Sequence, residues 1–343
     1  MTRYTDWFQQ LTGFRETTPE AVREQLLLDG EYLHSRANER RFRAGTLGVP
    51  TLRELRQSTE LPSDKTPRIT IREVVGDVQL FHLMPENAGA TFQAASQFNL
   101  LEMVSPEVTP EMGVTRYAHD RTQGPACAIA CGAGTIYRNY FVPLDDQIGQ
   151  TATRQIDCLS ELGTAMKNKE RGLWTTRNGY AFPTRIGLEV INRELEKLDE
   201  TGLDRIRGLL RVGVHHNTEV TLDDAGHTVT QVYCSALPIG YSQIPTPEWE
   251  PFARLILDAT YEATFLAAYA TFRQTGNNRL FLTLVGGGVF GNDSTWILAA
   301  IERSVDRFRQ LPLDVRVVSY GASNPRVRSR LDTGLMDWSA TRS

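Results

Sequence analysis

The sequence lacks the features that mark several large classes of protein. Its 343 residues include only four cysteines, at positions 127, 131, 158 and 234. That number is too small for a disulfide framework in a chain of this length, so we expect reduced, structural thiols. Lys and Arg together number 37 against 41 Asp and Glu, a net charge of −4. This near balance argues against nucleic acid or an anionic membrane as a partner.

Long hydrophobic runs are also missing. The longest apolar stretch, residues 280–290, is interrupted by glycines and is far shorter than the roughly 18 residues that a membrane span needs. The N-terminus from Met1 to Trp7 has no signal-peptide hydrophobic core. His215 and His216 have no metal-ligand spacing around them, so we read them as structural and expect no metal site. Together these absences predict a cytoplasmic protein.

The first 67 residues are expected to form a helical extension. Thr18 followed by Pro19 is a helix start, and an apolar face of Leu26, Leu27, Tyr32 and Leu33 would continue that helix. A second short helix is expected at 51–56. The turn-rich segment 61–67 then marks a boundary. Beyond it we expect an α/β core over residues 68–325, with a helical insertion at about 145–208, and a basic tail at 326–343.

Strands and helices alternate through the core, which predicts a sheet covered by helices. Strands are expected at 68–75, 91–95, 126–130, 209–214, 219–222, 228–237, 280–285 and 313–320, with a short strand or turn at 78–83. Residues 223–226 read as a hairpin turn, and 248–275 as a long helix ended by Gly276. The loop from 105 to 124 is long enough to suggest a function.

One glycine loop stands between an apolar strand and a helix. Gly286, Gly287 and Gly288 allow positive φ angles, and a helical apolar pattern follows from Ile297. A strand, glycine loop and helix in this order typically bind phosphate. The letters also match the dinucleotide fingerprint GxGxxG, which keeps an NAD-dependent oxidoreductase open. However, the next strand ends without the carboxylate that such a fold needs, and too few residues follow for its missing half.

Three short segments, in this order, resemble macrodomains, the ADP-ribose-binding family. In the first segment, 71–78, the resemblance implies that Asp77, followed by Val78, receives the adenine amino group. In the second, 92–99, it implies that Gln97 or Asn99 holds the distal ribose. In the third, 285–292, the main chain would cradle the diphosphate and Phe290 would close over the ribose. The ligand-binding residues of this third segment are Gly286, Gly287, Gly288, Val289, Phe290, Gly291 and Asn292.

The sequence departs from the macrodomain pattern in two respects. The glycine-rich loop that macrodomains place after the second segment is replaced by Leu100–Met103, so we expect a displaced loop formed by Gly132, Gly134 and Thr135. The Gln-Glu-Glu signature of the poly(ADP-ribose)-cleaving enzymes is missing, which places chain cleavage in doubt. The inserted helices and the N-terminal extension are most similar to the MavL-type macrodomain hydrolases. This implies a three-layer α/β/α sandwich with a mixed central sheet.

Two carboxylates are the candidate catalytic groups. Glu102 lies where the chain leaves an expected central strand, and Asp293 starts the helix after the glycine loop, where it also fits as an N-cap. Asp120 and Glu111 read as solvated charges. Arg138 fits either packing with a surface charge or recognition of a phosphate or a protein substrate. The expected function is hydrolysis of mono-ADP-ribose from a protein side chain, arginine and ubiquitin being the candidates that the resemblance implies, with ADP-ribose as ligand and no cofactor. A non-catalytic ADP-ribose reader is the alternative within the same fold.

Overall fold

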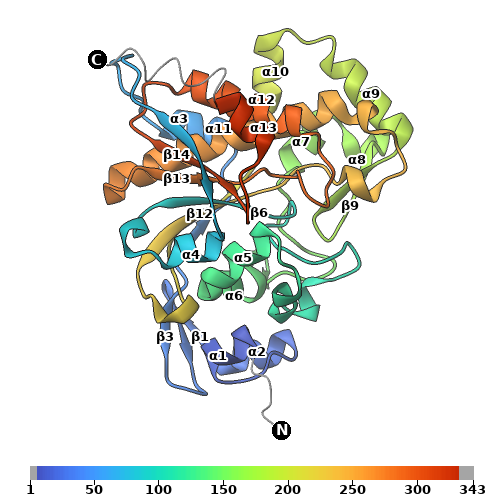
Figure 1. The fold of residues 1–343 in the computed structure, drawn as a ribbon. Coiled ribbons are helices and arrows are strands. Elements are labelled where there is room, and N and C mark those ends of the chain that lie inside the picture. Colours follow the sequence, from blue (N-terminus) through green and yellow to red (C-terminus); the bar gives the residue numbers. More distant parts are fainter. Residues whose placement is uncertain (1–5, 332–343) are drawn as a thin grey trace.

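The computed structural model describes residues 6–331, which form a three-layer arrangement around one mixed sheet (Figure 1). The central sheet has seven strands in the order β4-β11-β12-β6-β13-β14-β5. Five of them, from β12 to β5 in that order, are parallel, and β11 is antiparallel to both of its neighbours. The bounds are β4 Thr46–Gly48, β5 Thr70–Val75, β6 Thr91–Ala95, β11 Gly213–Glu219, β12 Thr228–Cys234, β13 Arg279–Leu282 and β14 Asp314–Ser319. The expected α/β sandwich with a mixed sheet is therefore confirmed.

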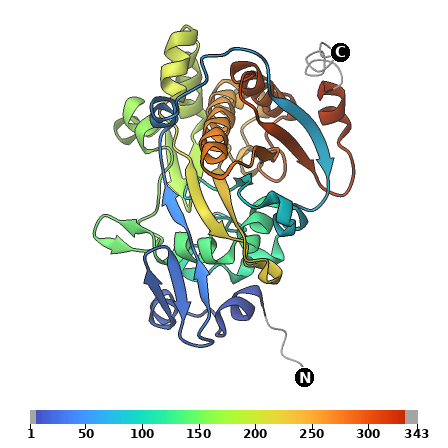
Figure 2. The ribbon, with the colours of Figure 1, turned by 90° about the vertical axis from the view of Figure 1, so that its left-hand side faces the viewer.

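Helices cover both faces of this sheet. The long helix α11 (Glu250–Thr275) and α12 (Ser294–Arg307) pack together on one face, and α4 (Val78–Leu83), α5 (Gln123–Ala130) and α6 (Gly132–Tyr140) lie on the other (Figures 1 and 2). The long helix and its C-cap are confirmed, since Gly276 has a φ of 78°. Apolar side chains of α11 and of the strands form the larger of two hydrophobic core clusters.

The N-terminal segment is only partly helical, contrary to the prediction. Helix α2 (Pro19–Gln25) starts at Thr18 as expected but ends at Leu26. Two antiparallel strands follow, and Gly30 turns the chain between them with a φ of 57°. Strand β4 then joins the central sheet, so this part of the segment is not an accessory to it. The remaining bounds are α1 Trp7–Thr12, β1 Leu26–Asp29, β2 Tyr32–Ser35, β3 Arg41–Arg43 and α3 Leu52–Ser58.

Two other segments are helices contrary to the prediction, which was a strand at 126–130 and a short strand or turn at 78–83. Residues 78–83 form α4, which Asp77 caps, and residues 126–130 belong to α5. The short apolar run at 126–130 has no clear period, and such runs do not distinguish a buried strand from a buried helix. Packing of α5 against β6 decided the outcome.

The expected helical insertion contains two hairpins as well as helices. Strands β9 and β10 were not predicted, although the dipeptide Asn178-Gly179 between them is a strong sequence signal for a hairpin turn. In the structure these two residues have the positive φ angles that such a turn needs, 47° and 78°. The elements are β7 Pro143–Leu144, β8 Gln147–Ile148, α7 Ser160–Ala165, α8 Asn168–Arg171, β9 Trp174–Arg177, β10 Tyr180–Pro183, α9 Arg185–Leu195 and α10 Glu200–Arg207. Short 3-10 helices occur at Pro85–Asn87, Pro110–Met112, Thr115–His119, Leu222–Asp224, Ile239–Tyr241 and Thr246–Trp249.

The cysteines and the C-terminal end complete the fold. All four cysteines are buried and free. Within residues 6–331 no helix is long and apolar enough to cross a membrane. The basic residues at the start of the expected tail belong to α13 (Pro325–Arg330), while positions 332–343 lie outside the described residues.

Candidate functional site

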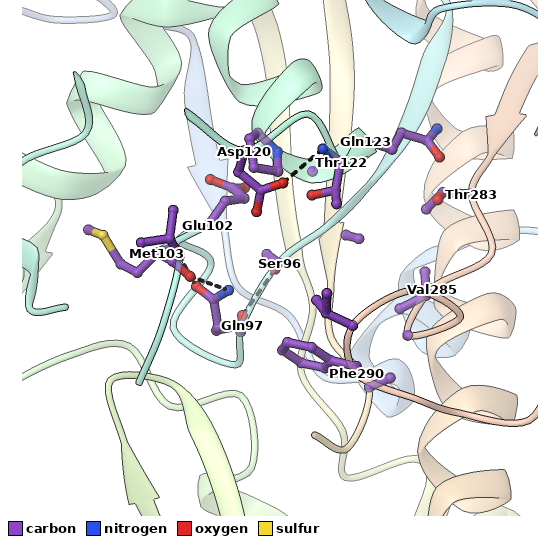
Figure 3. Close-up of a pocket in the computed structure, with 18 of the residues that line it drawn as sticks. Ser96, Gln97, Glu102, Met103, Asp120, Thr122, Gln123, Thr283, Val285 and Phe290 are labelled. Atoms are coloured by element: carbon purple, nitrogen blue, oxygen red, sulfur yellow. Dashed lines mark hydrogen bonds between the residues drawn. The ribbon is translucent and has the colours of Figure 1, made fainter. Parts of the chain in front are cut away.

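A cavity opens at the carboxyl ends of the parallel strands β6, β12 and β13, where ligands usually bind in α/β sheets (Figure 3). Its walls come from the chain after β6, the start of α5, the glycine loop after β13 and two tyrosines. The lining residues are Ala95, Ser96, Gln97, Glu102, Met103, Val104, Asp120, Thr122, Gln123, Gly124, Pro125, Tyr180, Ala236, Tyr241, Thr283, Leu284, Val285, Gly286, Gly288, Val289 and Phe290.

A second cavity adjoins the first at the ends of β5 and β14. It is lined by Gly76, Asp77, Val78 and Tyr320, among others. Asp120, Thr122 and Gln123 line both cavities. The two cavities therefore share part of their walls, and we call them together the cleft; Asp77 lines the second cavity and Glu102 the first.

A tight turn after β6 presents Glu102 to the cleft. The backbone N–H of Gln97 donates to the Leu101 carbonyl at 2.8 Å, and Leu100 adopts a φ of 65°. The Gln97 side chain holds the turn closed, since its carbonyl accepts from the Met103 N–H at 2.8 Å and its amide donates to the Met103 carbonyl at 3.3 Å. A positive φ at a leucine is strained, and such strain persists where the surroundings impose it.

Glu102 is a buried carboxyl group with few partners. Its side chain is 2% exposed, and neither of its oxygens has a hydrogen-bond partner among the described residues. The nearest cation is Arg138, whose Nη2 lies 3.8 Å from Oε1. Burial raises the pKa of Glu102 to about 8, and the charge of Arg138 and the nearby Tyr117 side chain only partly oppose this effect. The carboxyl group is therefore mostly protonated at neutral pH.

Asp120 is a second carboxylate beside Glu102 (Figure 3). It is half-buried, lines both cavities and accepts a hydrogen bond from the Thr122 N–H at 2.8 Å. Its charge contributes to the raised pKa of Glu102. The sequence predicted Asp120 to be a solvated loop charge, whereas the structure places it half-buried in the lining of both cavities. Its position within a loop too long to be only a connection was the available signal.

The start of α5 forms one wall of the cleft. The backbone N–H groups of Gln123 and Gly124 find no acceptor among residues 6–331, and both residues line the first cavity. Gly124 is required here, because a Cβ at this position would lie 2.1 Å from the carbonyl oxygen of Ala95. Helix α5 can therefore approach the end of β6 and present free N–H groups to a ligand.

The glycine loop after β13 forms the opposite wall. Gly286 has a φ of 77°, and the Asn292 N–H closes the loop by donating to the Gly286 carbonyl at 2.9 Å. Among the described residues no acceptor pairs with the N–H groups of Gly288, Val289 and Phe290. Consecutive unpaired N–H groups of this kind form an anion-binding cradle. At the start of the adjacent helix α12, the Asp293 carboxylate caps the helix by accepting from the Thr295 N–H at 2.7 Å.

Three aromatic rings close the end of the cleft near Gln97. The Tyr180 ring centroid lies 5.3 Å from those of both Tyr241 and Phe290, and the Tyr241 and Phe290 centroids are 5.7 Å apart. The Tyr180 hydroxyl also donates to the Met103 carbonyl at 2.8 Å. Neither tyrosine was identified from the sequence, because the hairpin and the turn that carry them are distant along the chain.

The sequence-predicted residues divide into three groups. Those that line the cleft are Asp77, Val78, Gln97, Glu102, Gly286, Gly288, Val289 and Phe290. Gly287, Gly291 and Asn292 belong to the glycine loop but do not line either cavity. Asn99, Gly132, Gly134, Thr135 and Asp293 lie outside the cleft lining.

The residues outside the cleft lining make contacts that stabilise the fold. The Asn99 side chain is buried, accepts from the Leu101 N–H and donates to Gln155, which stabilises the turn before Glu102. The prediction of a glycine loop at 132–135 is wrong, because these residues form the first turn of α6. A Cβ on Gly134 would lie 2.4 Å from Thr218 Oγ1, so this glycine serves close packing.

Arg138 is fully buried and lines neither cavity. Its guanidinium donates to the Leu100 carbonyl at 3.1 Å and lies 3.6 Å from the centroid of the Tyr233 ring. His215 beside it is also buried, and desolvation lowers its pKa well below the usual value. Residues 6–331 contain no group of three or more His, Cys, Asp or Glu that could hold a metal ion.

Comparisons with known proteins leave the family open. No family model and no curated protein matches the chain. Among solved structures, the chain is similar to the poly(ADP-ribose) glycohydrolase of Deinococcus radiodurans in complex with ADP-ribose, with 13% identity, 93% of this chain and 99% of that chain covered, and a TM-score of 0.41. The enzyme of Thermomonospora curvata gives 14% identity, 90% and 92% coverage and a TM-score of 0.38. Similarity of this extent does not assign the chain to their family, so we base the function on the site itself.

Proposed function

We propose that this protein hydrolyses the bond between ADP-ribose and a protein side chain. The observation that carries the proposal is Glu102, a buried carboxyl group that lines the cleft and has no hydrogen-bond partner for its oxygens among residues 6–331. A buried acidic group with a raised pKa, facing a cleft, is typical of a catalytic site.

The cleft offers a matching surface to each part of ADP-ribose. Asp77 would accept the adenine amino group, because one of its oxygens receives the Gln79 N–H and the other accepts no hydrogen bond from residues 6–331. The diphosphate would lie between the free N–H groups of α5 and those of the glycine loop. The distal ribose would then lie near Gln97, Glu102 and Phe290.

The two carboxyl groups differ in the way that glycosidic hydrolysis needs. In the proposed reaction the bond between the anomeric carbon and the side-chain atom breaks, and a bond from that carbon to a water oxygen forms. Protonated Glu102 donates its proton to the leaving atom, and Asp120 takes the proton of the attacking water. The negative charge of Asp120 also stabilises the positive charge that develops on the ribose.

The finer substrate assignment rests on the family resemblance alone. An arginine linkage and ubiquitin as the modified protein are the forms that we would assay first. No cofactor takes part in the proposed reaction. A cytoplasmic location belongs to the same proposal, and the four free, buried thiols are compatible with a reducing compartment.

An oxidoreductase is less well supported than a hydrolase. In dinucleotide-binding folds the pyrophosphate lies at the N-terminus of the helix that follows the glycine loop. Here the Asp293 carboxylate caps that helix and already accepts from the Thr295 N–H, one of the groups that a pyrophosphate at this helix start would use.

The deciding experiment compares binding with turnover. ADP-ribose, NAD and AMP are titrated by calorimetry, and release of ADP-ribose from arginine-ADP-ribosylated ubiquitin is followed in parallel. We expect ADP-ribose to bind most tightly and the wild-type protein to release the label, whereas Glu102→Gln binds ADP-ribose but releases none. Binding without release by the wild type would indicate a reader module. Tight NAD binding with negligible ADP-ribose binding would overturn the assignment of the cleft.

A further inference from the structure

The loop at 105–122 contributes two groups beside Glu102 and has to be held in place. The Tyr117 hydroxyl accepts a hydrogen bond from the Glu102 N–H at 3.0 Å, and Asp120 lines the cleft. Both belong to or directly follow the short 3-10 helix Thr115–His119. The position of that helix therefore sets both groups relative to Glu102.

One side chain of the N-terminal segment anchors the start of this 3-10 helix. Glu16 accepts from the Val114 N–H at 2.8 Å with Oε1 and from the Thr115 N–H at 2.7 Å with Oε2. The Tyr140 hydroxyl donates to the same Oε1 at 2.7 Å. Glu16 thus joins three parts of the chain that are distant in sequence: the N-terminal segment, the loop and helix α6.

The loop is shaped to receive this carboxylate. Gly113, directly before the two bound N–H groups, has a φ of 87°, and a Cβ there would lie 2.3 Å from Glu16 Oε2. Only a glycine allows the carboxylate to approach so closely. No Lys, Arg or His forms an ion pair with Glu16 among the described residues, so backbone N–H groups and one hydroxyl are its partners.

Apolar packing holds the same parts together. The second hydrophobic core cluster combines Phe8 and Leu11 of α1 with Val114 and Tyr117 of the loop. It also contains Leu101 and Met103, the two neighbours of Glu102. The N-terminal segment therefore packs against the residues that carry the reacting groups.

We infer that Glu16 is a positioning residue of the active site, which fixes Tyr117 and Asp120 against Glu102 through the loop at 113–120. The N-terminal segment is thereby a working part of the site. This inference rests on the proposed function, because it assigns Asp120 and Glu102 to one reaction.

The test uses the full chain with a matched control. Glu16→Gln replaces one of the two acceptor oxygens by an NH₂ group, and Glu16→Asp keeps both oxygens. Glu20→Gln is the control, because Glu20 lies four residues further on, is 73% exposed and forms an ion pair with Arg23. Misplacement of reacting groups by about 1 Å costs up to about 100-fold in rate. We therefore expect kcat to fall by about 10- to 100-fold in Glu16→Gln, with partial recovery in Glu16→Asp and wild-type turnover in Glu20→Gln.

Backbone amide hydrogen exchange measures how firmly the loop is held, independently of activity. Exchange over 110–122 should accelerate in Glu16→Gln and remain unchanged in Glu20→Gln, while the Kd for ADP-ribose changes little. Faster exchange without loss of kcat, or loss of kcat without faster exchange, would overturn the inference. If the wild type releases no ADP-ribose, the proposed function fails, and unchanged exchange in Glu16→Gln would show separately that the anchor is absent.

Discussion

Replacing Glu102 by Gln should stabilise the folded protein, and the gain should grow with pH. The wild-type carboxyl group is 2% exposed and has only Arg138, at 3.8 Å, as a nearby cation. Gln has nearly the same shape but cannot ionise, so the variant removes the cost of a buried charge. A functional group that destabilises its own fold in this way is common at active sites.

The magnitude follows from the pKa. Burial raises the pKa of Glu102 from 4.5 to about 8. The folded state therefore binds the proton more tightly than the unfolded state. The tighter proton binding of Glu102 in the folded state contributes stability that is complete below the unfolded pKa of 4.5 and is lost as the pH rises through about 8. At about 1.4 kcal/mol for each pKa unit, the loss is about 1 kcal/mol at about pH 5 and about 5 kcal/mol at about pH 9.

Urea unfolding of the wild type and Glu102→Gln at these two pH values measures the effect. The stability gain of the variant should be larger by about 4 kcal/mol at the higher pH, with an unchanged m-value. Glu107→Gln serves as the control, because the Glu107 side chain is 66% exposed and pairs with Arg177 at 3.0 Å. An equal gain at both pH values would refute the reasoning, since Glu102 would then not be the buried, proton-binding group.

Three further predictions test other parts of the site. Turnover should fall as the pH rises through about 8, because the proton that Glu102 donates is then lost; a pH–kcat profile that stays level across that range contradicts this role. Gly124→Ala should abolish ADP-ribose binding measured by calorimetry, because its Cβ would lie 2.1 Å from the Ala95 oxygen and force α5 from the cleft; wild-type affinity would show that this wall is not used. Asp293→Ala should cost about 1 kcal/mol in thermal unfolding through loss of the helix cap while leaving hydrolysis unchanged, so a large loss of kcat would restore Asp293 as a catalytic candidate.

Local patterns in the sequence were sufficient for several elements. The long helix was predicted at 248–275 and is found at 250–275 with the predicted C-cap, since its apolar residues recur at helical spacing and Gly276 follows them. Asp293 was predicted as a candidate catalytic carboxylate that also fits as an N-cap, and the structure shows the cap. The glycine loop was recognised because glycine and a strand–loop–helix order are properties of neighbouring residues, which a sequence displays directly.

Predictions failed where packing between distant segments decides the structure. The apolar composition of residues 126–130 fits a buried strand as well as a buried helix, and their packing against β6 selected the helix. Gly132 and Gly134 match the sequence pattern of a ligand-binding loop. In the structure their missing side chains allow α6 to pack closely against other parts of the chain. The glycine that does shape the cleft, Gly124, has no distinguishing neighbours in sequence.

The sequence by itself therefore determined the class of fold, the glycine loop and Glu102 as a carboxylate without an evident structural purpose. Only the tertiary structure decided which groups surround Glu102. Asp120 and Tyr117 come from a loop, Arg138 from α6 and the aromatic rings from segments after residue 179, and Glu16 anchors the loop from far upstream. The physical reason is that burial, and with it the proton affinity of a carboxyl group, arises from neighbours in space that the order of residues does not reveal.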